Sequence, residues 1–105
     1  MASTGETPVL DLLGTMTAAS VQASDLDARS LMLVRLAALV AVDAPPVSYL
    51  MNLEAASGLD VSADDVRGVL AAVAPIVGTS RVASATGKIV QALAVELEVA
   101  ALEAE

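Results

Sequence analysis

The chain of 105 residues contains no cysteine and no histidine, has a single aromatic residue, Tyr49, and carries a net charge of −8. Without a thiol or an imidazole, most nucleophilic, redox and transition-metal chemistry at neutral pH is excluded, because those groups have pKa values near the working pH. The acidic balance, with no Phe or Trp to stack on bases, also argues against nucleic-acid binding.

The length predicts one domain. We expect residues 1–7 to form a flexible N-terminus, which lacks the basic region of a signal peptide, and residues 8–105 to form a single all-α domain. The longest apolar stretch, Leu36–Val42, is far shorter than the ~20 residues that cross a bilayer. With no cysteine for disulfides, we predict a cytoplasmic protein with no membrane contact.

Capping residues divide the first half of the chain into three predicted helices. The first runs over about 8–21 and begins at a proline that follows a threonine cap. The second, about 28–42, is apolar on nearly every side and should lie in the middle of the structure. The third, about 46–57, has a proline in its first turn and ends before Gly58. The apolar face of the first helix comprises Val9, Leu12, Leu13, Met16 and Val21.

Two further helices are predicted in the second half. Ser62 and Asp65 resemble a capping box for the fourth helix, which Pro75 and Gly78 should close. Its apolar residues recur with helical spacing. The fifth helix runs from about residue 81 to near the C-terminus, after a Thr79-Ser80 cap. It has two apolar faces, Val82, Ile89, Leu93 and Leu97 on one and Val95, Val99 and Leu102 on the other.

The chain has more apolar surface than a small domain can bury. Apolar residues make up 56% of it before glycine is counted, whereas a typical domain has about 45–50% with glycine included. One face of the fifth helix can serve the core of the subunit, which leaves the other for a neighbour. We therefore predict a homo-oligomer.

The order of these features resembles the carboxymuconolactone decarboxylase family, which includes the alkylhydroperoxidase-D-like proteins. The resemblance covers about residues 26–97. It implies a small bundle of about five helices that assembles into trimers or hexamers. Four segments carry the resemblance: Leu26-Asp-x-Arg29, Ala55-Ala-Ser-Gly58-Leu-Asp60, Ser62-x-Asp-Asp65-Val66 and Ala74-Pro-Ile-Val-Gly78-Thr-Ser80.

The family's reactive groups are replaced in this chain. The resemblance places Leu50 at the position of the family's histidine, and Asp43 and Pro46 at the positions of its two cysteines. The position of its glutamate falls near Leu31. Without thiols a disulfide relay is impossible, and without the histidine lactone decarboxylation loses its proton carrier. The resemblance therefore implies a family member without the family's catalytic residues.

Asp43 and Tyr49 are the weak candidates for catalysis that remain. Asp43 is a general acid or base with a pKa raised by burial, a helix-end or turn residue, or a partner for Arg35 or Arg81. Tyr49 and Asn52 share one face of the third helix. They either line a small pocket, or Tyr49 is a core residue with one hydrogen bond.

Arg35 is the third candidate for ligand binding, beside Tyr49 and Asn52. A lone arginine on an apolar helix either binds an anion or forms half of a pair with a carboxylate. The acidic group Asp60, Asp64 and Asp65 lacks the spacing and glycine of a calcium loop. These acids suit the start of a helix, so we predict neither a metal nor a cofactor.

Three functions follow as hypotheses. The first is a non-catalytic family member that acts as an oligomeric scaffold or binds a small apolar ligand. The second is a helper subunit that pairs with an active paralogue or joins a larger complex. The third is a divergent lyase or isomerase that uses Asp43, Tyr49 and Arg35 for proton transfer. In all three we expect the chain to bind other copies of itself or a paralogous subunit.

Overall fold

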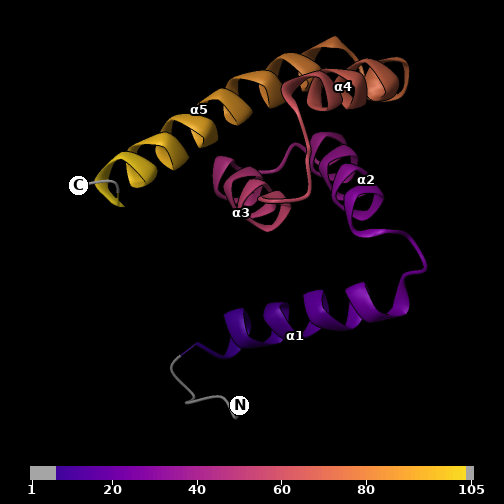
Figure 1. Ribbon diagram of the computed structural model, residues 1–105. Coiled ribbons are helices and arrows are strands. Elements are labelled where there is room, and N and C mark those ends of the chain that lie inside the picture. Colours follow the sequence, from indigo (N-terminus) through magenta and orange to yellow (C-terminus); the bar gives the residue numbers. More distant parts are fainter. Residues whose placement is uncertain (1–6, 104–105) are drawn as a thin grey trace.

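The computed structural model describes residues 7–103, apart from the side chains of residues 95–100 and 103. The predicted flexible N-terminus therefore lies almost wholly outside the described residues. Within the described part every element is a helix, which confirms the all-α prediction (Figure 1). The five helices are α1 (Pro8–Ala23), α2 (Ala28–Ala41), α3 (Pro46–Ala56), α4 (Ala63–Val77) and α5 (Thr79–Glu103).

Helix α2 is the central element of the bundle, as its apolar sequence predicts. It packs against α3, α4 and α5, and α3 packs in turn against α5. Figure 1 shows α4 and α5 above α2 and α3. The core joins Leu36 and Val40 of α2 to Tyr49 of α3 and to Ala85 and Ile89 of α5. Because this core is almost entirely aliphatic, close helix packing has to supply its stability.

The helix ends follow the capping signals of the sequence. Asp27 caps α2 by accepting a hydrogen bond from the Ser30 amide at 3.0 Å. The predicted capping box of α4 is confirmed: the Ser62 hydroxyl accepts from the Asp65 amide at 3.1 Å, and the Ser62 amide donates to Asp65 Oδ2 at 2.9 Å. Gly78 has a φ of 88°, which glycine adopts without strain, and it separates α4 from α5.

Two expected boundaries in this region are wrong. Pro75 does not close α4 but lies inside its last turn, and the helix continues to Val77. Pro75 has no amide to donate, so it removes one helical hydrogen bond, but the Gly78 amide still donates to the Ala74 carbonyl at 3.0 Å and completes the last turn. Thr79 and Ser80 are not a cap but the first residues of α5. The turn at Gly78 is sharp enough to start α5 at once.

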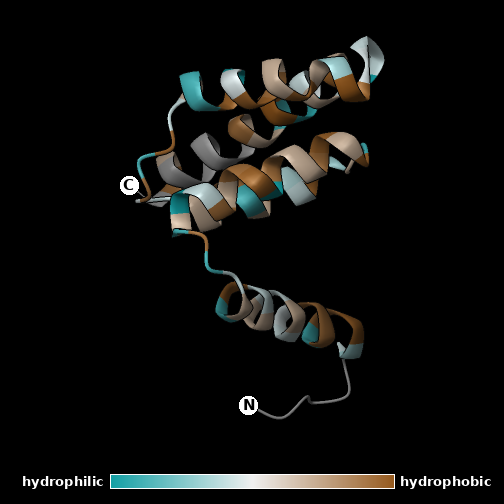
Figure 2. Cartoon of the chain, turned by 90° about the vertical axis from the view of Figure 1, so that its right-hand side faces the viewer, coloured by the Kyte–Doolittle hydropathy of each residue, from teal (hydrophilic) through white to brown (hydrophobic). Residues whose placement is uncertain are grey.

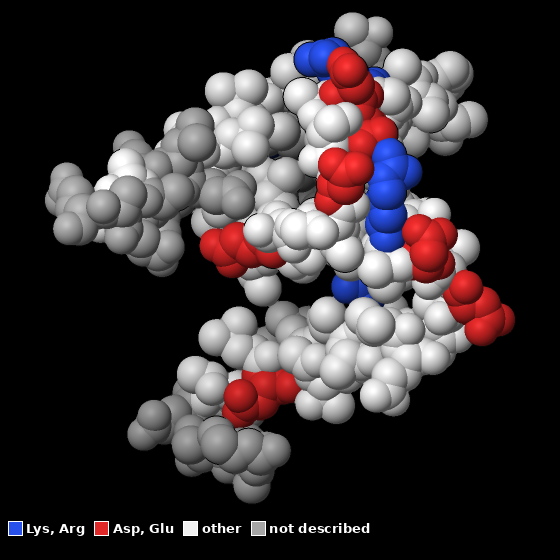
Figure 3. All heavy atoms as spheres, viewed as in Figure 1, with Lys and Arg blue, Asp and Glu red and all other residues white. Residues whose placement is uncertain are grey.

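Helix α1 is joined to α2 by hydrogen bonds from Arg35 but does not pack closely against the other four helices. It begins at Pro8 as predicted and ends at Ala23, and it has no buried residue. Figure 1 shows it below α2 and α3, and the turned view of Figure 2 shows the same separation, with hydrophobic residues on its surface. In Figure 3 most of its visible surface is uncharged. Its large apolar side chains, each 48–67% exposed, are Val9, Leu10, Leu12, Leu13, Met16 and Val21.

No helix in the described part of the chain is long and apolar enough to cross a bilayer.

We predict that Ser62→Ala lowers the free energy of unfolding by about 1 kcal/mol, because the first turn of α4 loses the acceptor for one of its amides. Urea unfolding followed by circular dichroism at a fixed protein concentration measures the change. Ser80→Ala is the matched control, since Ser80 is an exposed helix serine that makes no hydrogen bond within the described residues. Equal effects of the two substitutions would contradict the capping role.

Candidate functional site

Asp43 lies in the turn between α2 and α3 and fastens that turn to α5. Its Oδ1 atom accepts hydrogen bonds from the Ser84 hydroxyl at 2.8 Å and from Lys88 Nζ at 2.9 Å. Ser84 and Lys88 stand one helical turn apart on α5, so both reach the same carboxylate. Arg81, one turn earlier, donates to the Ala41 carbonyl. The expected pairing of Asp43 with Arg35 or Arg81 is therefore wrong, since Lys88 is the partner.

These contacts keep Asp43 ionised. The hydrogen bond from Lys88 lowers the pKa of the Asp43 carboxyl below its ordinary value, and that from Ser84 lowers it further. A general acid or base at neutral pH requires the opposite shift, toward the working pH. Asp43 also has a φ of 54°, a left-handed conformation that aspartate tolerates better than most residues. The arrangement is that of a structural turn.

Tyr49 is a core residue rather than part of an open pocket. Its side chain is fully buried, and within the described residues its hydroxyl has no hydrogen-bond partner. Burial raises the pKa of the phenol, and the negative charge of Asp43 raises it further. Tyr49 therefore remains protonated at neutral pH.

Asn52 and Arg35 point to different neighbours. The Asn52 amide donates to the Met32 carbonyl of α2 at 3.5 Å. Arg35 donates to Ser20 Oγ at 3.0 Å and to the Thr17 carbonyl at 3.5 Å, both on α1. Within the described residues its partners are thus a hydroxyl and a carbonyl, and the anion site and the pair with a carboxylate stay predictions. The three candidates for ligand binding do not converge on one space.

A shallow hollow lies where the resemblance places the family's reactive groups. It has a volume of about 200 Å³ and is lined by Pro46, Val47, Leu50, Gln91 and Ala92. Pro46 and Leu50 are the residues that the predicted resemblance aligns with a cysteine and the histidine of that family. Gln91 supplies the one polar side chain of this lining, and its amide does not titrate. The hollow therefore has no group that moves a proton at neutral pH.

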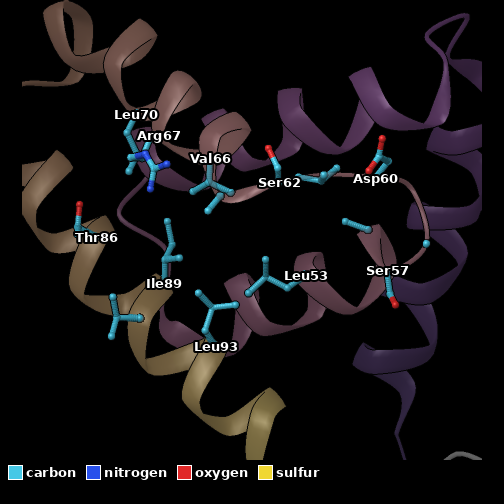
Figure 4. Close-up of a pocket in the computed structure, with 15 residues that line it drawn as sticks. Leu53, Ser57, Asp60, Ser62, Val66, Arg67, Leu70, Thr86, Ile89 and Leu93 are labelled. Carbon is cyan, nitrogen blue, oxygen red and sulfur yellow. The ribbon is translucent and has the colours of Figure 1, made fainter. Parts of the chain in front are cut away.

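The larger opening is an apolar groove of about 820 Å³ between α3, α4 and α5. Figure 4 shows Leu53 from α3, Val66 from α4, and Ile89 and Leu93 from α5 pointing toward the same space. The charged side chains in its lining are Asp60 and Arg67. The sequence did not predict this groove. The spacing of apolar residues in the fourth and fifth helices indicates which face of each helix is apolar. It does not indicate that these two faces are far enough apart to leave a groove between them.

The acidic residues at the start of α4 are neutralised by arginines. Asp65 pairs with Arg29 at 2.5 Å, and Asp64 pairs with Arg67. Hydrogen bonds from Ser62 and Arg29 lower the pKa of the Asp65 carboxyl. The described residues contain no cluster of acids able to hold a metal ion.

Comparison with known protein families, with curated proteins and with solved structures found no match for this chain.

We predict that Tyr49→Phe raises the free energy of unfolding, by on the order of 1 kcal/mol, because a buried hydroxyl without a partner is costly. Urea unfolding at fixed protein concentration, followed by circular dichroism, gives the change. A loss of more than about 1 kcal/mol would show that the hydroxyl has a partner, such as a buried water molecule.

A second prediction concerns pH. Since the folded pKa of Asp43 is lowered, its carboxylate stabilises the folded state fully above the ordinary pKa, and this contribution fades as pH falls from about 4 downward. Asp43→Asn keeps a residue that accepts a positive φ and removes the charge. It should be less stable than the parent at pH 7, and the difference should close at pH 2.

Thermal unfolding across pH 2–7 measures that difference. Asp25→Asn serves as the control, because Asp25 is exposed and makes no hydrogen bond within the described residues. If the Asp43→Asn difference were the same at every pH, the bond with Lys88 would not be the cause.

Proposed function

We propose that this chain is a non-catalytic subunit of a homo-oligomer and acts as an oligomeric scaffold. The observation that carries the proposal is the large uncovered surface of the single chain. Its accessible surface is 7108 Å², whereas a folded monomer of its mass exposes about 5,400 Å². The radius of gyration of 14.9 Å also exceeds the ~13 Å of a globular domain of this length. A standard interface buries about 800 Å² on each partner.

The chemistry of the uncovered surface supports assembly. Six large apolar side chains of α1 are at least 48% exposed. Burial of their exposed surface in an interface would contribute a free energy on the order of 5–10 kcal/mol. Association costs roughly 4–15 kcal/mol in lost freedom, so α1 alone supplies a large share of what an interface needs. Large exposed apolar patches on small proteins usually mark surfaces that contact another protein.

The absence of catalysis is supported by the state of the candidate residues. Asp43 is held as an ion by Lys88 and Ser84. Tyr49 is neutral and enclosed in the core. The hollow beside Pro46 and Leu50 is lined mainly by apolar side chains. No two of these groups form a proton-transfer pair, which disfavours a lyase or isomerase built on Asp43, Tyr49 and Arg35.

We also propose that the chain is a member of the family that its sequence resembles. The five helices, the capping box at Ser62 and the turn at Asp43–Pro46 follow the order that resembles the carboxymuconolactone decarboxylase family. On that basis we propose a trimer or a hexamer as the assembly.

Binding of a small apolar ligand is the second candidate function, favoured by the 820 Å³ groove between α3, α4 and α5. Its volume falls within the range of ligand pockets, about 300–1,000 Å³. Such a ligand would compete with any protein segment for the same surface.

Sedimentation equilibrium over a range of protein concentrations tests the assembly. We expect a mass of three or six times the 10.5 kDa of the chain. A monomer of 10.5 kDa at all concentrations would overturn the scaffold role, because the surface of α1 would then remain in water. In that outcome a helper subunit that requires a different partner becomes the better explanation.

A further inference from the structure

Helix α1 presents a row of apolar anchors that no described residue of its own chain covers. Val9, Leu12, Leu13 and Met16 follow the i, i+3, i+4, i+7 spacing of a helix that docks into an apolar groove. The four are all at least half exposed. At a rise of about 1.5 Å per residue, this row is about 10.5 Å long.

The groove between α3, α4 and α5 has walls of the same length. The wall from α4 consists of Ala63, Val66, Arg67 and Leu70, and the wall from α5 of Thr86, Ile89, Val90 and Leu93. Both sets have the i, i+3, i+4, i+7 spacing, so each wall is also about 10.5 Å long. Leu53 of α3 points into the space between them (Figure 4). The groove therefore presents two turns of helix on each side, which matches the anchored part of α1.

A chain's own α1 does not occupy its groove. The hydrogen bonds of Arg35 to Ser20 and Thr17 hold α1 on α2. The groove is bounded by the other three helices. Figure 1 shows α1 below α2 and α3, while α4 lies above them. The two surfaces of one chain thus remain separate, and each is available to another copy.

We infer that α1 of one copy docks into the groove between α3, α4 and α5 of a second copy. This inference rests on the proposed oligomeric role and names the contact that builds the assembly. The uncovered surface of the chain is about 1,700 Å² larger than that of a compact monomer. In the proposed contact each copy has two contact surfaces, its α1 and its groove. A standard interface buries about 800 Å² on each surface, so the two together would bury about as much area as the excess.

The described part of α1 has one charged residue, Asp11, and helical spacing places it on the face opposite the four anchors, so the anchor row itself is uncharged. Because the two contacting surfaces differ, the contact is heterologous. It closes as a ring of copies, which agrees with the trimer or hexamer that we propose.

Cysteine cross-linking gives a direct test, because the natural chain has no thiol that would interfere. Two differently tagged variants are mixed, Leu13→Cys in α1 and Val90→Cys in the groove, and treated with a short bismaleimide. We expect a covalent heterodimer whose cross-linked peptide joins positions 13 and 90. The matched control pairs Leu13→Cys with Ile76→Cys, because Ile76 is 86% exposed but lies outside the groove. This control should give at least tenfold less product.

Two results of the cross-linking would overturn the inference. One is equal product with position 76, or product only between two copies of position 13. The other arises in the double variant with Leu13→Cys and Val90→Cys in one chain, if its cross-link is intramolecular and its mass stays that of a monomer. That product would place α1 in its own groove.

A second measurement separates this docking from assembly in general. The pair Leu12→Glu and Leu13→Glu places two charges in the contact, while α2–α5 should fold unchanged by circular dichroism. We expect at least a tenfold weaker association by sedimentation equilibrium, with Ile76→Glu as a control that leaves it unchanged. An assembly that persists in the double variant would overturn the docking and leave the scaffold role standing. A parent chain that is monomeric would overturn both.

Anilinonaphthalene sulfonate, a dye that fluoresces when it binds apolar surfaces, tests whether a small ligand rather than α1 occupies the groove. In the parent assembly α1 should exclude it, and the Leu12→Glu, Leu13→Glu variant should bind it with increased fluorescence. Strong binding by the parent assembly that Val90→Arg abolishes would show an open groove that takes a small ligand, and would overturn the inference.

Discussion

The packing of α2 against α3, α4 and α5 is the interaction on which the rest of the structure depends. Leu36 and Val40 meet Tyr49 and Ile89 in one aliphatic core. Every other feature is positioned from there, because α2 carries Arg35 on the side of α1 and leads at its end into the Asp43 turn. Since the chain has one aromatic residue, this core consists mainly of small and branched side chains. Such a core buries little apolar surface, and much of the apolar surface of the chain stays exposed.

The Asp43 turn shows how a position that the resemblance links with chemistry serves structure in this chain. A carboxylate in a left-handed turn receives hydrogen bonds from Ser84 and Lys88, while Arg81 holds the carbonyl of Ala41. The turn between α2 and α3 is thereby tied to α5 by polar contacts at the edge of the core. The same contacts keep the charge fixed, and a fixed charge is of little use in proton transfer.

The excess of aliphatic surface links the fold to the proposed role. Exposed side chains on α1 and an apolar groove of about 820 Å³ occur in one chain of 10.5 kDa. Both surfaces are apolar, so their exposure to water is unfavourable. In the assembly that we propose, contact between copies would bury both surfaces together.

The sequence by itself determined the helices and most of their ends, because a capping box such as Ser62 with Asp65, or a glycine such as Gly78, acts within a few residues. It also determined which chemistry is excluded, since a missing thiol or imidazole is missing in any fold. Only the tertiary structure decided that Lys88 rather than an arginine pairs with Asp43, 45 residues away, and that Arg35 bonds to α1. Only the tertiary structure, too, separated α4 from α5 to open the groove. Helical spacing gives the face of each helix but not the distance between two helices, which packing around α2 sets.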